Sequence, residues 1–262
     1  MPTVRWEDIR REAQALAASS GDPADFLPQW EALLERHANR RFRPGQSLPP
    51  SILPAYHTPP AVLTAVWQAL RAHLQMREHL ILPLADALWE HNILESRQLA
   101  SRLLGLAPVV PETPVITRLW DWLASTTDIT LQQELLQHGT RRLVSEAPQA
   151  YLEAVRQAVA QPQRVRLGLA ALPPLLASPA FQNLPRVFRL LTPLLEAPDP
   201  DLRPELVAVL LAAARRWPEE TTPYLRSLWH NYPHPILAWL IRRVLPALPD
   251  EHASALQEIL ET

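Results

Sequence analysis

The sequence predicts an all-α protein, built as a right-handed superhelical solenoid of about six antiparallel helix pairs. Proline is abundant (29 residues) and glycine is scarce (5), which is typical of helices joined by short, stiff connections. A turn signal followed by an apolar-striped helix returns roughly every 34 to 37 residues. One helix pair cannot bury its apolar face alone, so pairs at this period are expected to stack. The turn signals lie near Asn92, Asp128, Pro162, Asp199 and Pro233.

Residues 1–52 are expected to form a helical pair followed by a loop. Thr3 is suited to cap a helix that carries Trp6, Ile9, Ala13 and Leu16 at helical spacing. The turn at 21–23 ends this helix and starts a second one, which contains Phe26, Trp30, Leu33 and Leu34. Residues 40–60 are rich in Pro, Arg and Ser without a sustained period, which predicts a linker or a surface loop.

Residues 53–262 are expected to form the repeat array, as one continuous domain with the N-terminal part. Pro59 and Pro60 open one helix, and residues 77–90 form the next. Regular leucine-rich pairs follow to the C-terminus. Prolines inside the apolar stripes are expected to kink their helices; they are Pro83, Pro173, Pro174, Pro185 and Pro193. A true break at Pro173–Pro174 is the alternative, but the stripe continues through Leu176 and favours a kink.

Composition excludes several classes of function. There is no cysteine, and all 25 cationic residues are arginine, which excludes disulfides, thiolate sites, Schiff-base lysines and Walker-type phosphate loops. We expect no metal and no cofactor, because the pairs His91/Glu95 and His230/His234 are each broken by a turn residue. The longest apolar run, 206–214, is too short to span a bilayer, and the N-terminus does not read as a secretory signal. A cytoplasmic protein without a membrane role is expected.

Three segments carry a resemblance to known helical-repeat families. Residues 163–170 (QRVRLGLA) and 198–203 (PDPDLR) resemble the opening of the second helix of a HEAT repeat. Residues 84–90 (LADALWE) with 94–104 (LESRQLASRLL) are similar to the HEAT-like glycosylases of the DNA alkylation repair family. Element order and spacing extend this resemblance over roughly residues 54–246. It implies a HEAT-like fold, DNA as the ligand and alkylpurine DNA glycosylase activity.

The chain departs from that family at the positions that matter for catalysis. The family's catalytic aspartate lies at the start of the helix that spans about residues 128–146 here, and it falls at Gln133 or its neighbour. A later family aromatic falls near Ala208. Excision of a cationic base needs a carboxylate and aromatic faces, so we expect no catalytic residue. Asp128 is a weak candidate to substitute for the missing aspartate, as is Glu134.

Paired arginines are the candidate nucleic-acid-binding residues. Several fall late in successive helices and are expected to form one row on the concave surface, where they would grip phosphates without reading sequence. The structural alternative is that they cap helix C-termini or form ion pairs between repeats with Glu146, Glu205 or Glu219. The eight candidates are Arg141, Arg142, Arg164, Arg166, Arg215, Arg216, Arg242 and Arg243.

Tryptophan offers a second possible contact surface. Trp120 and Trp122 are two residues apart, so they point in different directions on a helix and cannot both face the core. One of them is expected to be partly exposed or wedged between repeats. Exposed tryptophan suits base stacking or a protein contact.

The sequence therefore favours three functions, in order from the most to the least favoured. The first is non-catalytic binding of duplex DNA through a concave arginine-lined face. The second is a protein–protein interaction scaffold with no nucleic-acid role, which the net charge of −2 favours. The third is an active alkylpurine DNA glycosylase. The sequence does not indicate an oligomeric state.

Overall fold

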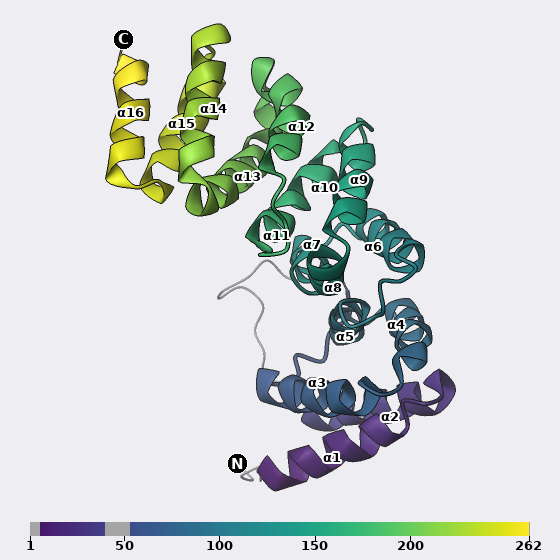
Figure 1. Ribbon diagram of the computed structural model, residues 1–262. Coiled ribbons are helices and arrows are strands. Elements are labelled where there is room, and N and C mark those ends of the chain that lie inside the picture. Colours follow the sequence, from purple (N-terminus) through teal and green to yellow (C-terminus); the bar gives the residue numbers. More distant parts are fainter. Residues whose placement is uncertain (1–5, 40–52, 262) are drawn as a thin grey trace. The chain divides into compact units, whose positions relative to one another are not determined.

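The computed structural model describes residues 6–39 and 53–261, and in these ranges every regular element is a helix (Figure 1). The predicted all-α class is confirmed. The chain forms two compact units, Met1–Arg142 (unit 1) and Leu143–Thr262 (unit 2). No helix of the described ranges combines the length and the apolar character needed to cross a membrane.

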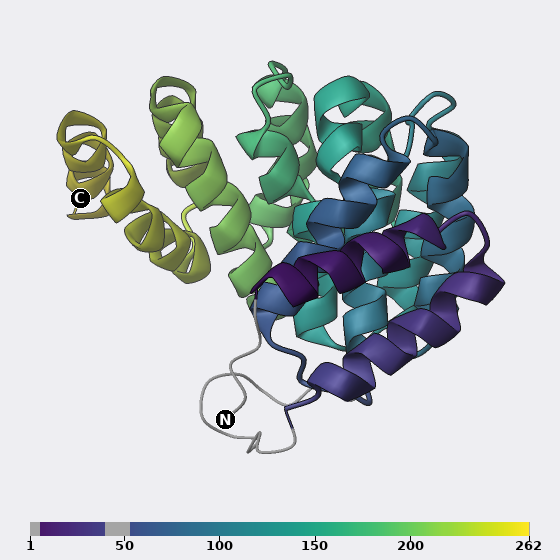
Figure 2. The same ribbon diagram turned by 90° about the horizontal axis from the view of Figure 1, so that it is seen from below.

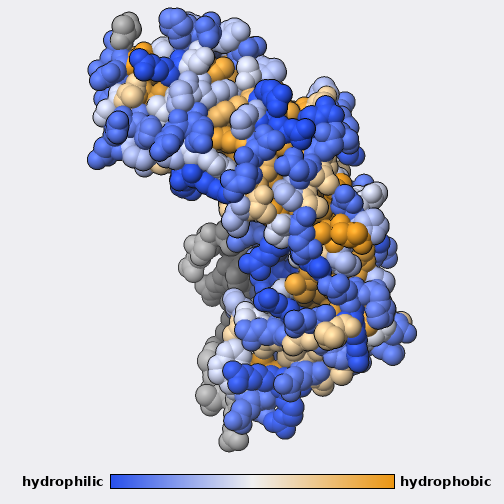
Figure 3. All heavy atoms as spheres, viewed as in Figure 1, coloured by the Kyte–Doolittle hydropathy of each residue, from blue (hydrophilic) through white to orange (hydrophobic). Residues whose placement is uncertain are grey.

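Unit 1 begins with the expected helical pair, which packs on the helices that follow. α1 lies along α3, and α4 lies along α5 (Figures 1 and 2). Most side chains visible on the face of α1 in Figure 3 are hydrophilic. Unit 1 contains α1 (Trp6–Ala18), α2 (Pro23–His37), α3 (Pro60–Leu74), the 3₁₀ turn η1 (Glu78–Leu80), α4 (Ile81–Glu90), α5 (Leu94–Leu104), α6 (Thr113–Ser125), α7 (Ile129–Glu134) and the π-helical turn η2 (Leu135–Gly139).

The start of α2 shows how local sequence sets these boundaries. Asp22 Oδ1 accepts a hydrogen bond of 2.8 Å from the Ala24 amide, and Pro23 occupies the first helical position, where no amide donor is needed. Phe26, Trp30 and Leu34 are then buried at helical spacing. Thr3 and residues 40–52 of the expected linker lie outside the described ranges.

α8 (Arg141–Glu146) begins at the end of unit 1 and continues into unit 2. Unit 2 then contains α9 (Pro148–Val159), α10 (Val165–Ala170), α11 (Leu172–Ala177), α12 (Leu184–Glu196), the 3₁₀ turn η3 (Pro200–Leu202), α13 (Arg203–Arg216), α14 (Pro218–Asn231), α15 (Pro235–Val244), the 3₁₀ turn η4 (Leu245–Ala247) and α16 (Asp250–Glu261). α11 and α13 pack together, as do α13 and α15.

Side-chain contacts within each unit join residues at a recurring separation of 32 to 37 positions. In unit 1, Arg118 binds Asp86 and Arg142 binds the Leu106 carbonyl. In unit 2, Ser178 binds the Val144 carbonyl, Arg186 binds Gln149, and Tyr224 binds the Phe188 carbonyl. This separation matches the spacing of the turn signals in the sequence.

The prolines behave differently from expectation at three places. Pro83 and Pro185 lie in the first turns of α4 and α12, where they start helices. The kink expected at Pro173–Pro174 is wrong: α10 ends at Ala170, and both prolines lie in the first turn of α11. A proline there lacks an amide donor that the first turn does not use, so a new helix costs less than a kinked one. Of the five prolines expected to kink a helix, Pro193 is the one that lies well inside its helix; Pro28 and Pro223 also lie inside theirs.

Two further expectations concern α4 to α8. The helix expected over residues 128–146 is interrupted, because its middle turn, η2, is π-helical. Trp120 and Trp122 are both buried. The expectation that they cannot both face inwards is therefore wrong. Trp122 of α6 stacks on Trp89 of α4 with a centroid distance of 4.5 Å, so the contact between these two helices buries it.

Candidate functional site

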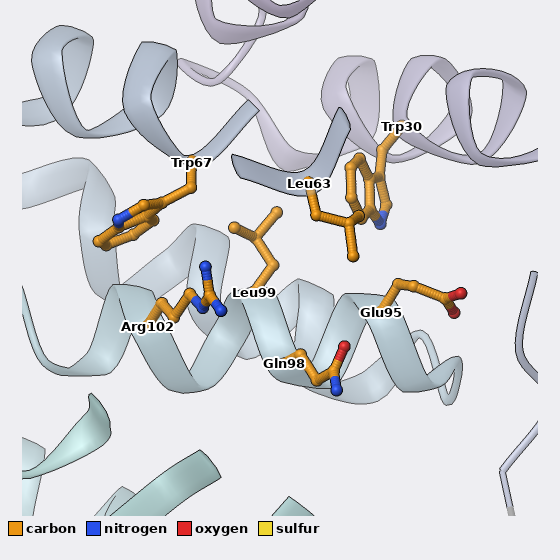
Figure 4. Close-up of a pocket in the computed structure, with 7 residues that line it drawn as sticks. All are labelled: Trp30, Leu63, Trp67, Glu95, Gln98, Leu99 and Arg102. Carbon is orange, nitrogen blue, oxygen red and sulfur yellow. The ribbon is translucent and has the colours of Figure 1, made fainter. Parts of the chain in front are cut away.

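Unit 1 has a hollow of about 210 Å³ at the place where α3, the end of α5 and η2 meet. We call it the Trp67 hollow; its lining residues are Trp67, Arg102, Gly105, Leu106, His138 and Arg141. A smaller cavity of about 20 Å³ adjoins it between α3 and α5, and Trp67 and Arg102 line both. In Figure 4, Trp67 and Leu63 of α3 lie opposite Leu99 and Arg102 of α5.

The wall of the hollow is held by a close approach between two backbones. Gly105 caps the end of α5, and a Cβ atom built on it would lie 1.8 Å from the carbonyl oxygen of His138. Only glycine permits that distance. His138 lies in the π-helical turn, a rare element that is frequent at functional sites. The geometry of the hollow therefore depends on Gly105 and η2 together.

Two arginines line the hollow, and one carboxylate, Glu134, lies beside it. Arg102 Nε lies 3.9 Å from Glu134 Oε2, and His138 Nε2 lies 3.3 Å from the same oxygen. That oxygen is buried and has no hydrogen-bond partner in the described part of the chain. Burial raises the pKa of Glu134, and Arg102 opposes the rise. Since no carboxylate lines the hollow itself, its lining is cationic.

His138 contributes a neutral ring to this lining. Burial, with Arg102 and Arg141 nearby, lowers the pKa of His138 to about 4. The imidazole is therefore uncharged near neutral pH, with one nitrogen able to donate a hydrogen bond and the other able to accept one.

The stability of the protein is expected to fall as the pH is lowered from about 6.5 towards 4, by roughly 1 to 3 kcal/mol on account of His138 alone. In this window the unfolded histidine binds a proton and the folded one does not, so protonation favours unfolding. The raised pKa of Glu134 acts in the opposite direction and offsets part of the loss.

Urea denaturation of the wild type and of His138→Gln across this pH range checks the prediction. The loss on acidification should be smaller in the variant, because Glu134 is common to both proteins. Equal slopes would contradict it.

Three of the eight candidate arginines make structural contacts inside one unit. Arg142 donates to Glu78 at 2.6 Å and to the Leu106 carbonyl at 2.9 Å. Arg166 forms an ion pair with Glu205 at 3.1 Å. Arg216 donates to the carbonyl oxygens of Leu176, Ser178 and Phe181. These contacts agree with the structural alternative stated for arginine pairs.

The other five candidates are exposed or half-buried. Arg141 lines the Trp67 hollow, Arg164 is half-buried, and Arg215, Arg242 and Arg243 are exposed. Arg243 lies 5.2 Å from the centre of the Trp239 ring, and Arg203, which the sequence did not single out, lies 5.6 Å from it. Unit 2 thus brings two guanidinium groups to one indole.

Asp128 is the N-cap of α7. Its Oδ1 accepts a hydrogen bond of 3.2 Å from the Leu131 amide, and the side chain is buried. Asp128 does not line the Trp67 hollow, and Gln133 is exposed. The capping bond accounts for an aspartate at this position.

Sequence reasoning missed Trp67, Arg102 and His138. Trp67 could have been noticed, because it is a large aromatic residue on the helix that opens at Pro60. Arg102 was read only as part of the family resemblance, and nothing local marks it or His138 as neighbours of Trp67.

A buried cluster near α5 has the residue types of a hydrolase triad. Ser96 Oγ lies 3.0 Å from His91 Nδ1, and His91 Nε2 lies 3.6 Å from a carboxylate oxygen of Glu31. Ser96 is fully buried, and its Oγ accepts a hydrogen bond from Trp30 Nε1. A nucleophile must reach its substrate, and the buried Ser96 hydroxyl cannot. The role of these contacts is therefore structural: they join α2 to α5.

The chain matches no protein-family model, no curated protein and no solved structure.

Proposed function

We propose that this protein binds duplex DNA without catalysing a reaction on it, and that Arg102 and Arg141 contact backbone phosphates at the Trp67 hollow. The observation that carries the proposal is the lining of the hollow: two guanidinium groups, an indole and a neutral imidazole, with no carboxylate. Guanidinium groups bind phosphate well, because their paired N–H donors match its oxygens.

Because the net charge of the protein does not attract DNA, binding must depend on a local cluster of cationic residues. With a net charge of −2, the protein has no overall attraction to DNA. In the part of the chain that the structure describes, the carboxylate paired with Arg102 is 3.9 Å away, so Arg102 keeps donors for a ligand. Arg203 and Arg243 beside Trp239, together with Arg215 and Arg242, are proposed as further phosphate contacts on unit 2.

The proposed architecture is a HEAT-like right-handed solenoid of about six helix pairs. The contacts at separations of 32 to 37 positions support it, because stacked repeats place equivalent residues of neighbouring repeats side by side. The proposed relation to the DNA alkylation repair family rests on the sequence resemblance. The capping role of Asp128 and the exposure of Gln133 support a non-catalytic relative.

The test is a salt titration of DNA affinity. The double variant Arg102→Glu/Arg141→Glu is expected to weaken binding of a short fluorescein-labelled duplex by at least about tenfold. It should also lower the slope of log K against log salt by about two, one for each lost phosphate contact. Fluorescence anisotropy at several salt concentrations measures both quantities.

The matched control is Arg10→Glu/Arg226→Glu, which makes the same change in net charge at two exposed sites, one in each unit. Its effect should stay within about threefold. Equal effects of the two double variants would show that only total charge matters, and absence of any DNA binding would remove the proposal.

A protein-interaction scaffold is the second candidate. Four large apolar side chains are exposed among the described residues of unit 1, and such residues suit a protein contact. They are Met76 at 90%, Val110 at 87%, Ile129 at 66% and Trp6 at 53%. A partner that is captured equally well after nuclease treatment and is lost on their replacement by serine would favour this function.

A further inference from the structure

Trp67 is the unusual member of the hollow. It is half-buried, lines both cavities, and stacks on no other ring among residues 6–39 and 53–261. Trp30, Trp89, Trp122 and Trp217 each pair with another aromatic ring. Of the five tryptophans without such a pair in the described ranges, Trp67 is the one that lines the hollow. An indole beside an open hollow offers its face to a planar ligand.

The hollow has the size and the chemistry for such a ligand. Its volume of about 210 Å³ contrasts with the 20 Å³ of the adjoining cavity, which has room for about one water molecule. Leu106 adds an apolar surface, and the neutral ring of His138 can donate to or accept from a polar edge. Arg102 and Arg141 supply cations at the same place.

The hollow is also held in shape. α5 and η2 touch through backbone atoms at Gly105 and His138. Thr140, the residue that follows η2, donates a hydrogen bond of 2.6 Å from its Oγ1 to the Leu136 carbonyl of the π-helical turn. A cavity with rigid walls binds a planar group with little loss of side-chain entropy.

We infer that the Trp67 hollow receives a single unpaired nucleobase, which stacks on Trp67 while its neighbouring phosphates contact Arg102 and Arg141. The inference rests on the proposed DNA binding and narrows its ligand. DNA that offers an unstacked base binds better than fully paired DNA, because the protein does not have to break a base pair to fill the hollow.

The test compares three DNAs of the same length and flanking sequence: a paired duplex, a duplex with one central bulged nucleotide, and the same bulge with an abasic residue. The bulged duplex is expected to bind the full-length protein about tenfold more tightly than the paired duplex, as one base–aromatic stack implies. The abasic bulge, which keeps the distorted backbone and lacks the base, should lose most of this advantage.

Substitutions locate the effect. Trp67→Leu keeps an apolar side chain and should bring the ratio of bulged to paired affinity close to one, whereas Trp67→Phe should keep part of the preference. Trp6→Leu is the control, because Trp6 is also in unit 1 and exposed but lies outside the hollow. Circular dichroism checks that each variant folds. If Trp67→Leu does not fold, the ratio of bulged to paired affinity measured for Trp67→Phe tests the inference.

Each outcome bears on one proposal. No affinity for any of the DNAs overturns the proposed function and this inference with it. Equal affinity for paired and bulged DNA overturns only the inference, as does an abasic bulge that binds as tightly as the bulged base. A preference that survives Trp67→Leu and Trp67→Phe unchanged also overturns it.

Discussion

Gly105→Ala is expected to lower the free energy of unfolding of unit 1 by about 3 kcal/mol or more. The added Cβ would lie 1.8 Å from the His138 carbonyl oxygen and 2.9 Å from its carbonyl carbon. These are backbone atoms, so no change of rotamer relieves the clash, and α5 and η2 must move apart. Gly105 itself has ordinary helical angles (φ −73°, ψ −4°), so alanine causes no conformational strain there.

Gly21→Ala is the matched control, since a Cβ at Gly21 would meet nothing within 4 Å. Its effect should stay within about 0.5 kcal/mol. Urea denaturation followed by circular dichroism measures both variants. Because the clash opens the wall of the Trp67 hollow, Gly105→Ala should also weaken DNA binding. A variant as stable as the wild type would show that α5 and η2 separate at little cost, and the hollow would then not be rigid.

Arg216→Ala is expected to lower the free energy of unfolding of unit 2 by about 2 to 3 kcal/mol. The guanidinium group donates to three backbone carbonyls around the α11–α12 turn: Leu176 at 2.9 Å, Phe181 at 3.0 Å and Ser178. It also lies 4.2 Å from the centre of the Trp217 ring. Alanine removes the charged donor from all three carbonyl oxygens; the Ser178 carbonyl keeps its hydrogen bond of 3.1 Å from the Phe181 amide.

Arg215→Ala is the control for this variant, because Arg215 is the adjacent residue, is equally cationic and is exposed. It should change the free energy of unfolding by less than about 0.5 kcal/mol. Arg216→Lys keeps the charge but cannot span three carbonyls, so it should recover only a small part of the loss. Thermal and urea unfolding of the three variants measure these differences. Equal effects of Arg215→Ala and Arg216→Ala would contradict a structural role for Arg216.

The arginine pairs show where sequence reasoning reached its limit. The sequence shows the pairs Arg141–Arg142 and Arg215–Arg216, and it predicts two alternative roles for them, phosphate contact and capping of helix ends. In both pairs the second arginine donates hydrogen bonds to backbone carbonyls that lie 35 to 40 positions earlier in the chain. The direction in which each side chain points depends on the neighbouring helix, which a single helix pattern does not specify.

The prolines illustrate the same limit at the level of helix boundaries. The apolar stripe through Leu172, Leu175 and Leu176 is real, since all three are buried. It continues across Ala171 because two short helices share one buried side, and periodicity alone does not separate this arrangement from one kinked helix.

The sequence by itself determined that this protein is helical, where most helices begin, and which side of many helices is buried, because caps, prolines and 3.6-residue periodicity act within a few residues of each other. Only the tertiary structure decided which side chains meet. Trp67, Arg102 and His138 come from α3, α5 and η2, and their shared hollow exists because Gly105 allows two backbones to touch. That contact joins residues far apart in the chain, and its physical basis is packing geometry in three dimensions, which no local pattern of residues contains.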